Sequence, residues 1–151
     1  MKYIEFSNEI LSPLFSSLSS FKLDVTDSIT RRKFLRLIKY IVADKEETVN
    51  EISIKYSVKN TDGKPHILDN GRYEYTKEGR NSLYSDLKKL ESETSKIELS
   101  NIDIETVNKM KDIIIRESDK YKEKHKEMTN SEHEYLFTLM DCARVLNEVK
   151  E

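Results

Sequence analysis

The chain contains few of the residues that interrupt or cross-link a fold. Its 151 residues include three glycines, two prolines, one cysteine and no tryptophan. Because glycine and proline are the strongest breaks in regular structure, their scarcity predicts few turns and long helices. The single cysteine, Cys142, excludes an intramolecular disulfide and is typical of a protein in a reducing compartment.

Charge of one sign and long apolar runs are also missing. Lysine and arginine number 26 against 28 aspartates and glutamates, so no overall field favours a nucleic acid or a membrane surface. No stretch approaches the roughly 18 apolar residues of a membrane span, and residues 1–6 lack the apolar run of a signal peptide. We expect a soluble, cytoplasmic protein that makes no membrane contact.

Signatures of catalysis are absent as well. The sequence has no Gly-x-Ser-x-Gly turn and no glycine-rich phosphate loop. No two of the three histidines, His66, His125 and His133, have the i, i+4 spacing that lets two imidazoles share a metal on one helix. The sequence therefore predicts no catalytic residue, metal site or cofactor, and we expect Cys142 to be a buried thiol.

What the chain does have is charge and helical periodicity. Charged residues make up 36% of it, against about 25% in typical proteins, so the apolar residues must gather on narrow stripes. Thr26, Asp27 and Ser28 are capping residues, and a helix is predicted from Ile29 to Val58. An apolar seam with heptad spacing runs along it: Leu35, Val42, Val49 and Tyr56, with Ile38 and Ile52 between them.

A second seam follows a segment that contains all three glycines. It predicts a helix from about Thr76, and its members are Leu83, Leu87, Leu90, Thr94 and Ile97. Two seams joined by a short connection favour an antiparallel pair of helices. Residues 59–76 should form a tip that projects from the pair, with turns at Gly63 and Asn70-Gly71 and a small β-hairpin through Ile67 and Tyr75.

The remaining segments flank this helical hairpin. Helices are expected over Asn8 to Ser20, from about Asp103, and from a capping box at Ser131–Glu134 to Val149. Lys2–Phe6 and Lys96–Leu99 alternate like strands, and we expect them to pair. No internal repeat is evident. The predicted fold class is α+β, mostly α-helical, in a single domain over 1–151.

The first long helix carries a concentrated group of basic residues. Its members are Arg31, Arg32, Lys33, Arg36 and Lys39. Three of them share the face opposite the apolar arc, so the group is a candidate patch for phosphates or an acidic partner. The alternative is an ordinary solvated helix face, because acidic residues follow directly along the chain.

Aromatic residues gather around the expected tip. Tyr56, His66, Tyr73 and Tyr75 form a candidate partner interface, because tyrosine offers a large contact area at a low entropy cost. The alternative is that the hairpin uses these rings for its own cross-strand packing.

The order of these motifs is similar to that of a known group of proteins. Thr30–Ile38 begins a helix with alternating basic and apolar residues, Lys55-Tyr56 leads to Thr61–Pro65, and Ile97-Glu98-Leu99 precedes a closing amphipathic helix. In this the chain resembles a family of short proteins of unknown function from bacteriophages and prophages of Gram-positive bacteria. The resemblance implies a phage context in the cytoplasm of a bacterial host or in the virion, and it carries no assigned activity or functional residue.

Two functions remain open at this point. The first is a non-enzymatic interaction protein of a phage, acting as an adaptor, an assembly accessory or a host-factor binder, with a phage or host protein or a second copy as its partner. The alternative is a nucleic-acid-associated protein that uses the face from Arg31 to Lys39. An enzyme ranks third, because no catalytic constellation is visible.

Overall fold

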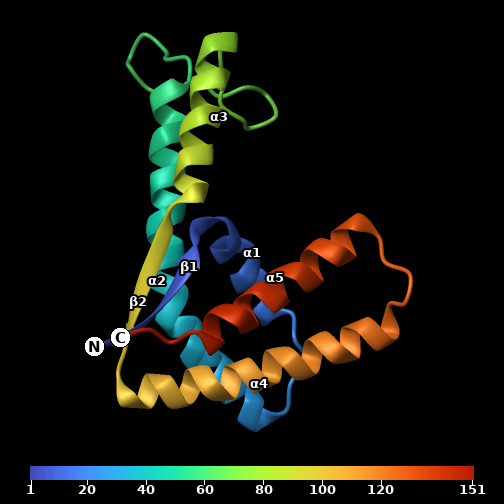
Figure 1. The fold of residues 1–151 in the computed structure, drawn as a ribbon. Coiled ribbons are helices and arrows are strands. Elements are labelled where there is room, and N and C mark those ends of the chain that lie inside the picture. Colours follow the sequence, from blue (N-terminus) through green and yellow to red (C-terminus); the bar gives the residue numbers. More distant parts are fainter. The chain divides into compact units, whose positions relative to one another are not determined.

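The computed structural model describes residues 1–151 and shows a mostly helical α+β fold, with five helices and a two-stranded antiparallel sheet (Figure 1). The elements in chain order are β1 (Lys2–Ser7), α1 (Asn8–Ser19), α2 (Val25–Tyr56), α3 (Lys77–Ser92), β2 (Thr94–Leu99), α4 (Asn101–Lys124) and α5 (Asn130–Asn147). None of the helices combines the length and the apolar character that crossing a membrane requires.

Contacts divide the chain into two compact units. The core unit consists of Met1–Val42 together with Thr94–Glu151, and the hairpin unit is Ala43–Glu93. The boundary falls within α2, after Val42. The single domain over 1–151 and the projection of the tip 59–76 stay predictions.

The sheet joins the two sequence segments of the core unit. β1 and β2 pair antiparallel, with Ile4 opposite Ile97. This confirms the expected pairing. The amide of Tyr3 donates to the carbonyl oxygen of Lys150 (2.9 Å), and the Lys150 amide donates to the Tyr3 carbonyl oxygen (2.8 Å). The chain near Lys150 therefore lies along the other edge of β1.

The core lies between this sheet and the apolar faces of α1, α4, α5 and the first part of α2. Residues with no exposed surface at its centre are Ile4, Phe6, Leu11, Leu14, Leu18, Phe34, Ile38, Val107, Met110, Ile114, Leu139 and Cys142. The expected apolar arc of α2 is confirmed at Phe34, Ile38 and Val42. Cys142 is buried as expected, and burial raises the pKa of its thiol.

The start of α2 and the end of α3 differ from those expected. α2 begins at Val25, four residues before Ile29, because Asp24 supplies the cap: the Asp27 amide donates to its carboxylate (2.8 Å). α3 begins near Thr76 as expected, with Thr76 as its cap, but it ends at Ser92. Thr94 and Ile97, assigned to the helical seam, belong to β2, where pairing with β1 buries Ile97 and satisfies the backbone.

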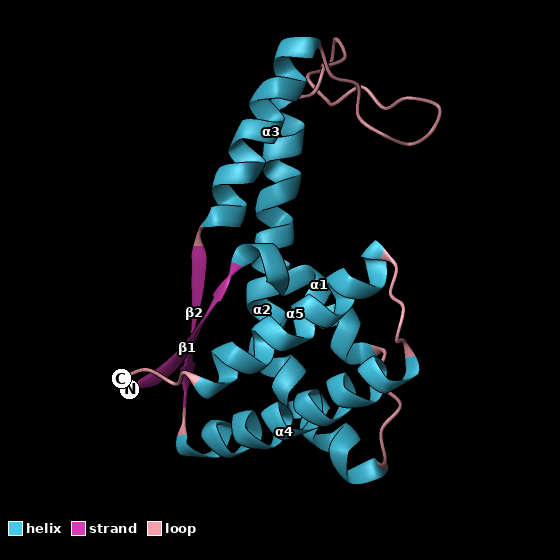
Figure 2. Ribbon diagram, turned by 45° about the vertical axis from the view of Figure 1, so that its right-hand side comes forward, coloured by secondary structure: helices cyan, strands magenta, loops and turns pink.

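The hairpin unit places α3 alongside the second half of α2 in the opposite direction, in both Figure 1 and Figure 2. Leu83 is the one buried apolar residue of α3. The Tyr56 hydroxyl donates to the Asp86 carboxylate (2.6 Å). A β-carbon built on Gly79 would lie 2.7 Å from the Tyr56 carbonyl oxygen, so the start of α3 touches the end of α2 directly.

The segment between these helices consists of two similar turns, eight residues apart. In each turn a side-chain oxygen accepts from the amide two residues later, Asp62 from Lys64 and Asn70 from Arg72, both at 3.0 Å. The glycine after each acceptor has φ near 80°, which glycine adopts without strain. The two turns therefore repeat the same local geometry at an interval of eight residues.

The β-hairpin expected through Ile67 and Tyr75 is also corrected. Ile67 pairs with Tyr73, and the pairing is an isolated bridge, like the one between Lys59 and Pro65. Backbone bonds connect Val58, His66 and Glu74 in a ring. Because these three residues are spaced by eight, each turn begins and ends at this ring of bonds. The segments between them are too short to form strands, and only isolated bridges are present.

Capping boxes begin the last two helices. Ser100 and Asp103 cap α4, and Thr129 and Glu132 cap α5. The box expected at Ser131–Glu134 is two residues too late, because Thr129 has the extended backbone of a cap (φ −70°, ψ 167°). Hydrogen bonds from the Thr129 hydroxyl and amide lower the pKa of the Glu132 carboxyl.

A pair of alanine substitutions tests this cap. Thr129→Ala should destabilise the core unit by about 1 kcal/mol, whereas Ser131→Ala should change stability by less than about 0.5 kcal/mol. Because the pKa of Glu132 is lowered in the fold, its contribution is present above the ordinary carboxyl pKa and fades as pH falls through the lowered value. The difference between the two variants in urea unfolding should therefore shrink in acid. Equal effects at neutral pH would contradict the assigned cap.

A second test concerns Gly79. Helix propensity alone favours alanine there by about 1 kcal/mol, but the new methyl group would meet the backbone oxygen of Tyr56, and overpacking costs roughly 1–3 kcal/mol. We expect Gly79→Ala to speed amide exchange in the hairpin unit, whereas Asn81→Ala, at an exposed position of the same helix, should not. A Gly79→Ala protein with slower exchange would contradict the close contact.

Candidate partner-binding groove

A groove of about 840 Å³ lies within the hairpin unit. Three parts of the unit line it: the second half of α2, the start of α3 and the turns between them. The lining residues are Glu46, Val49, Asn50 and Ser53 of α2, Ile67, Leu68, Asn70, Gly71, Arg72, Tyr73 and Tyr75 of the connecting segment, and Arg80, Leu83 and Tyr84 of α3. We call it the hairpin groove.

Hydrogen bonds hold the second turn against α2. The Tyr75 hydroxyl donates to the carbonyl oxygen of Ser53 (3.1 Å). The Val58 amide donates to the Glu74 carbonyl oxygen (2.8 Å), which ties the end of the second turn to the second residue after α2. These bonds fix the wall of the groove on its α2 side.

The groove exposes apolar surface and unpaired positive charge. Ile67 is 58% exposed and Tyr84 is 62% exposed. The side chains of Arg72 and Arg80 form no ion pair or hydrogen bond within the chain, and Glu46 is the one acidic residue of the lining. Exposed apolar groups beside free guanidinium groups are suited to a segment with apolar and acidic side chains.

The structure brings together half of the expected interface. Tyr73 and Tyr75 line the hairpin groove. Tyr56 and His66 do not: the Tyr56 hydroxyl is bonded to Asp86, and the His66 ring lies 2.9 Å from the Asn60 side-chain oxygen and 3.8 Å from the Glu74 carboxylate. The sequence did not identify Ile67 as part of a partner interface. The repeated turn pattern at Asp62-Gly63 and Asn70-Gly71 was the signal that Ile67 belongs to a loop and is not buried on a strand.

The basic patch divides in the same way. The Arg31 guanidinium donates to the carbonyl oxygens of Phe21 (2.5 Å), Leu18 (3.1 Å) and Ser19 (3.4 Å) at the end of α1. These bonds satisfy carbonyl groups that the end of a helix leaves without hydrogen-bond donors. Arg31 is therefore part of the fold.

Arg32, Arg36 and Lys39 border a smaller hollow of about 350 Å³, which we call the basic hollow. Its lining is Phe15, Ser19, Ser28, Arg31, Arg32, Leu35, Arg36 and Lys39. Lys33 is exposed and lies outside this lining. Three of the five basic residues therefore remain available to a ligand at one place.

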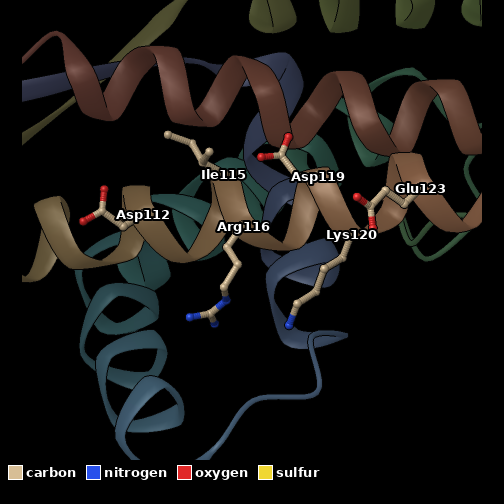
Figure 3. A pocket seen from close by; sticks show the side chains of 6 residues that line it. All are labelled: Asp112, Ile115, Arg116, Asp119, Lys120 and Glu123. Atoms are coloured by element: carbon tan, nitrogen blue, oxygen red, sulfur yellow. The ribbon is translucent and has the colours of Figure 1, made fainter.

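Another hollow, of about 390 Å³, runs along α4. Figure 3 shows that its six labelled side chains all come from this one helix. Its basic residues are compensated: Arg116 lies 2.7 Å from the Asp27 carboxylate, and Lys120 lies 3.4 Å from that of Glu117. Because one helix provides the whole lining and its basic residues are in ion pairs, this hollow is not a candidate ligand site.

The histidines do not form a metal-binding cluster with other side chains. His125 stacks on Tyr121 with ring centroids 4.1 Å apart, and its ring lies 3.4 Å from the Glu132 carboxylate at the start of α5. No three side chains of histidine, cysteine, aspartate or glutamate are placed to hold a metal ion. The residues predicted from the sequence to bind a partner thus line two surfaces, the hairpin groove and the basic hollow.

Comparison of the chain with protein-family models, with curated proteins and with solved structures finds no match in any of the three.

Substitutions separate the structural arginine from the exposed ones. Arg31→Ala should destabilise the core unit by about 1–3 kcal/mol, because it leaves carbonyl groups without their charged donor. Arg36→Ala removes the same charge from an exposed position and should change stability by less than about 0.5 kcal/mol. Thermal unfolding at several salt concentrations measures both. Equal stability of the two variants would contradict the conclusion that Arg31 stabilises the end of α1.

Proposed function

We propose that this chain is a non-enzymatic interaction protein that holds a short segment of a protein partner in the hairpin groove. The setting is the phage context that the sequence resemblance implies, in which the protein acts as an adaptor, an assembly accessory or a host-factor binder. The antiparallel helix pair and its turns provide the binding surface.

The observation that carries the proposal is the combination of exposed Ile67 and Tyr84 with the unpaired Arg72 and Arg80 around one groove. Isolated exposed apolar residues are ordinary on a protein surface, but here they line a concavity that is large enough for several side chains. Two guanidinium groups against one carboxylate give the lining a net positive charge. The segment that fits carries apolar residues next to aspartate or glutamate.

A selection from random peptides tests this function and needs no identified partner. Peptides selected on the full chain should become enriched in apolar residues adjacent to acidic ones. Ile67→Ser and Tyr84→Ser should each lower the affinity for the selected peptides by about tenfold or more, as expected for residues at the centre of an interface. Arg72→Ala should lower the affinity for the acidic peptides and reduce the salt dependence of their binding.

Tyr40→Ser is the matched control, because Tyr40 is 79% exposed but lies on the core-unit part of α2. Selected peptides should bind this variant as tightly as the original chain. Peptides without acidic residues, or peptides that bind the Tyr84→Ser variant unchanged, would contradict the proposal.

The basic hollow supports a second candidate, a nucleic-acid-associated function. Arg32, Arg36 and Lys39 border it together with Phe15, and cations beside an aromatic ring suit phosphates and bases. Retention of DNA or RNA that is lost when these three cations are replaced by alanine, with no peptide enrichment, would favour this function over the first.

A further inference from the structure

One edge of the sheet in the core unit has no partner. Because both the amide and the carbonyl of Tyr3 bond to Lys150, they point away from β2. In an antiparallel pair, backbone groups alternate in direction, so Ile4 and its partner Ile97 bond to each other. It follows that the backbone groups of Lys96 and Glu98 point away from β1.

No other segment bonds to these groups. The sheet has two strands, and no further backbone bond reaches Lys96 or Glu98. Figure 2 shows β1 along one side of β2 and no strand along its other side. Both side chains are exposed, whereas Ile97 between them is buried. The edge therefore presents two amides and two carbonyls. Its exposed side chains carry one charge of each sign, and the Lys96 ammonium lies 4.7 Å from the centre of the Tyr3 ring on β1.

This arrangement is complementary to itself in one register. If two copies of β2 pair antiparallel with Ile97 opposite Ile97, Lys96 of each copy meets Glu98 of the other. Those are also the residues whose backbone groups point outward, so the strands would share four hydrogen bonds. A shift by two residues in one direction places Lys96 opposite Lys96, and in the other direction Glu98 opposite Glu98, and like charges directly opposite are unfavourable.

We propose that β2 is a self-association edge, at which two copies of this chain join their sheets into one of four strands, in the order β1, β2, β2, β1. A lysine on a strand edge ordinarily discourages pairing with other chains. A second β2 is the partner that offers a carboxylate opposite this lysine, so the same residue that repels other strands selects this one.

Charge exchange tests the register. Sedimentation equilibrium of the full chain between about 10 µM and about 1 mM should show a reversible dimer. Lys96→Glu and Glu98→Lys should each raise the dissociation constant by about tenfold or more, because each replaces two attractive pairs by two repulsive ones. An equimolar mixture of the two variants should regain the original affinity, since every acidic residue then faces a basic one.

Control variants make the same charge changes elsewhere. Lys109→Glu and Glu105→Lys lie on the exposed surface of α4 and should leave the dimer unchanged. A chain that stays monomeric to about 1 mM, or a dimer that the mixture does not restore, would overturn the proposal. Amide exchange of the unaltered chain gives an independent reading: exchange at Lys96 and Glu98 should slow with concentration, and rates independent of concentration would overturn it too.

Discussion

The pairing of β1 with β2 is the interaction on which the core unit depends. Residues 1–42 and 94–151 make up this unit, and the hairpin unit separates them in sequence. The two strands bring the segments together and present Ile4, Phe6, Ile97 and Leu99 to the same core. Glu5 on the opposite face accepts from Thr94 (2.7 Å) and Lys150 (3.1 Å), bonds that lower the pKa of its carboxyl. The sheet thus gathers three parts of the chain.

The second constraint is that α2 serves both units. Its heptad seam continues through Val42 and Val49, although Val42 is buried in the core unit and Val49 lines the hairpin groove. A helix that meets different neighbours along its length needs one apolar stripe throughout. The seam could therefore be read from the sequence. Its one interruption, Lys45 at the seam position between Val42 and Val49, lies three residues beyond the division after Val42.

Local chemistry decided which other features could be predicted. Alternation in Lys2–Phe6 and Lys96–Leu99 identified both strands, and Thr76 identified the start of α3. Ile97 fitted a helical and a strand pattern equally, and tertiary pairing chose between them. The same limit applies to the candidate surfaces. Charge and aromatic content marked segments that line the two surfaces, but Arg31 and Tyr56 are bonded within the fold, which composition cannot reveal.

Amide hydrogen exchange under native conditions tests the role of the sheet most directly. In a dilute sample, the amides of Ile4 and Ile97 should exchange only through global unfolding of the core unit, at the same free energy as the slowest amides of α4 and α5. Exchange of the strand amides by local opening, well before those of α4 and α5, would contradict the account. It would mean that the two segments of the core unit are held together without the strands.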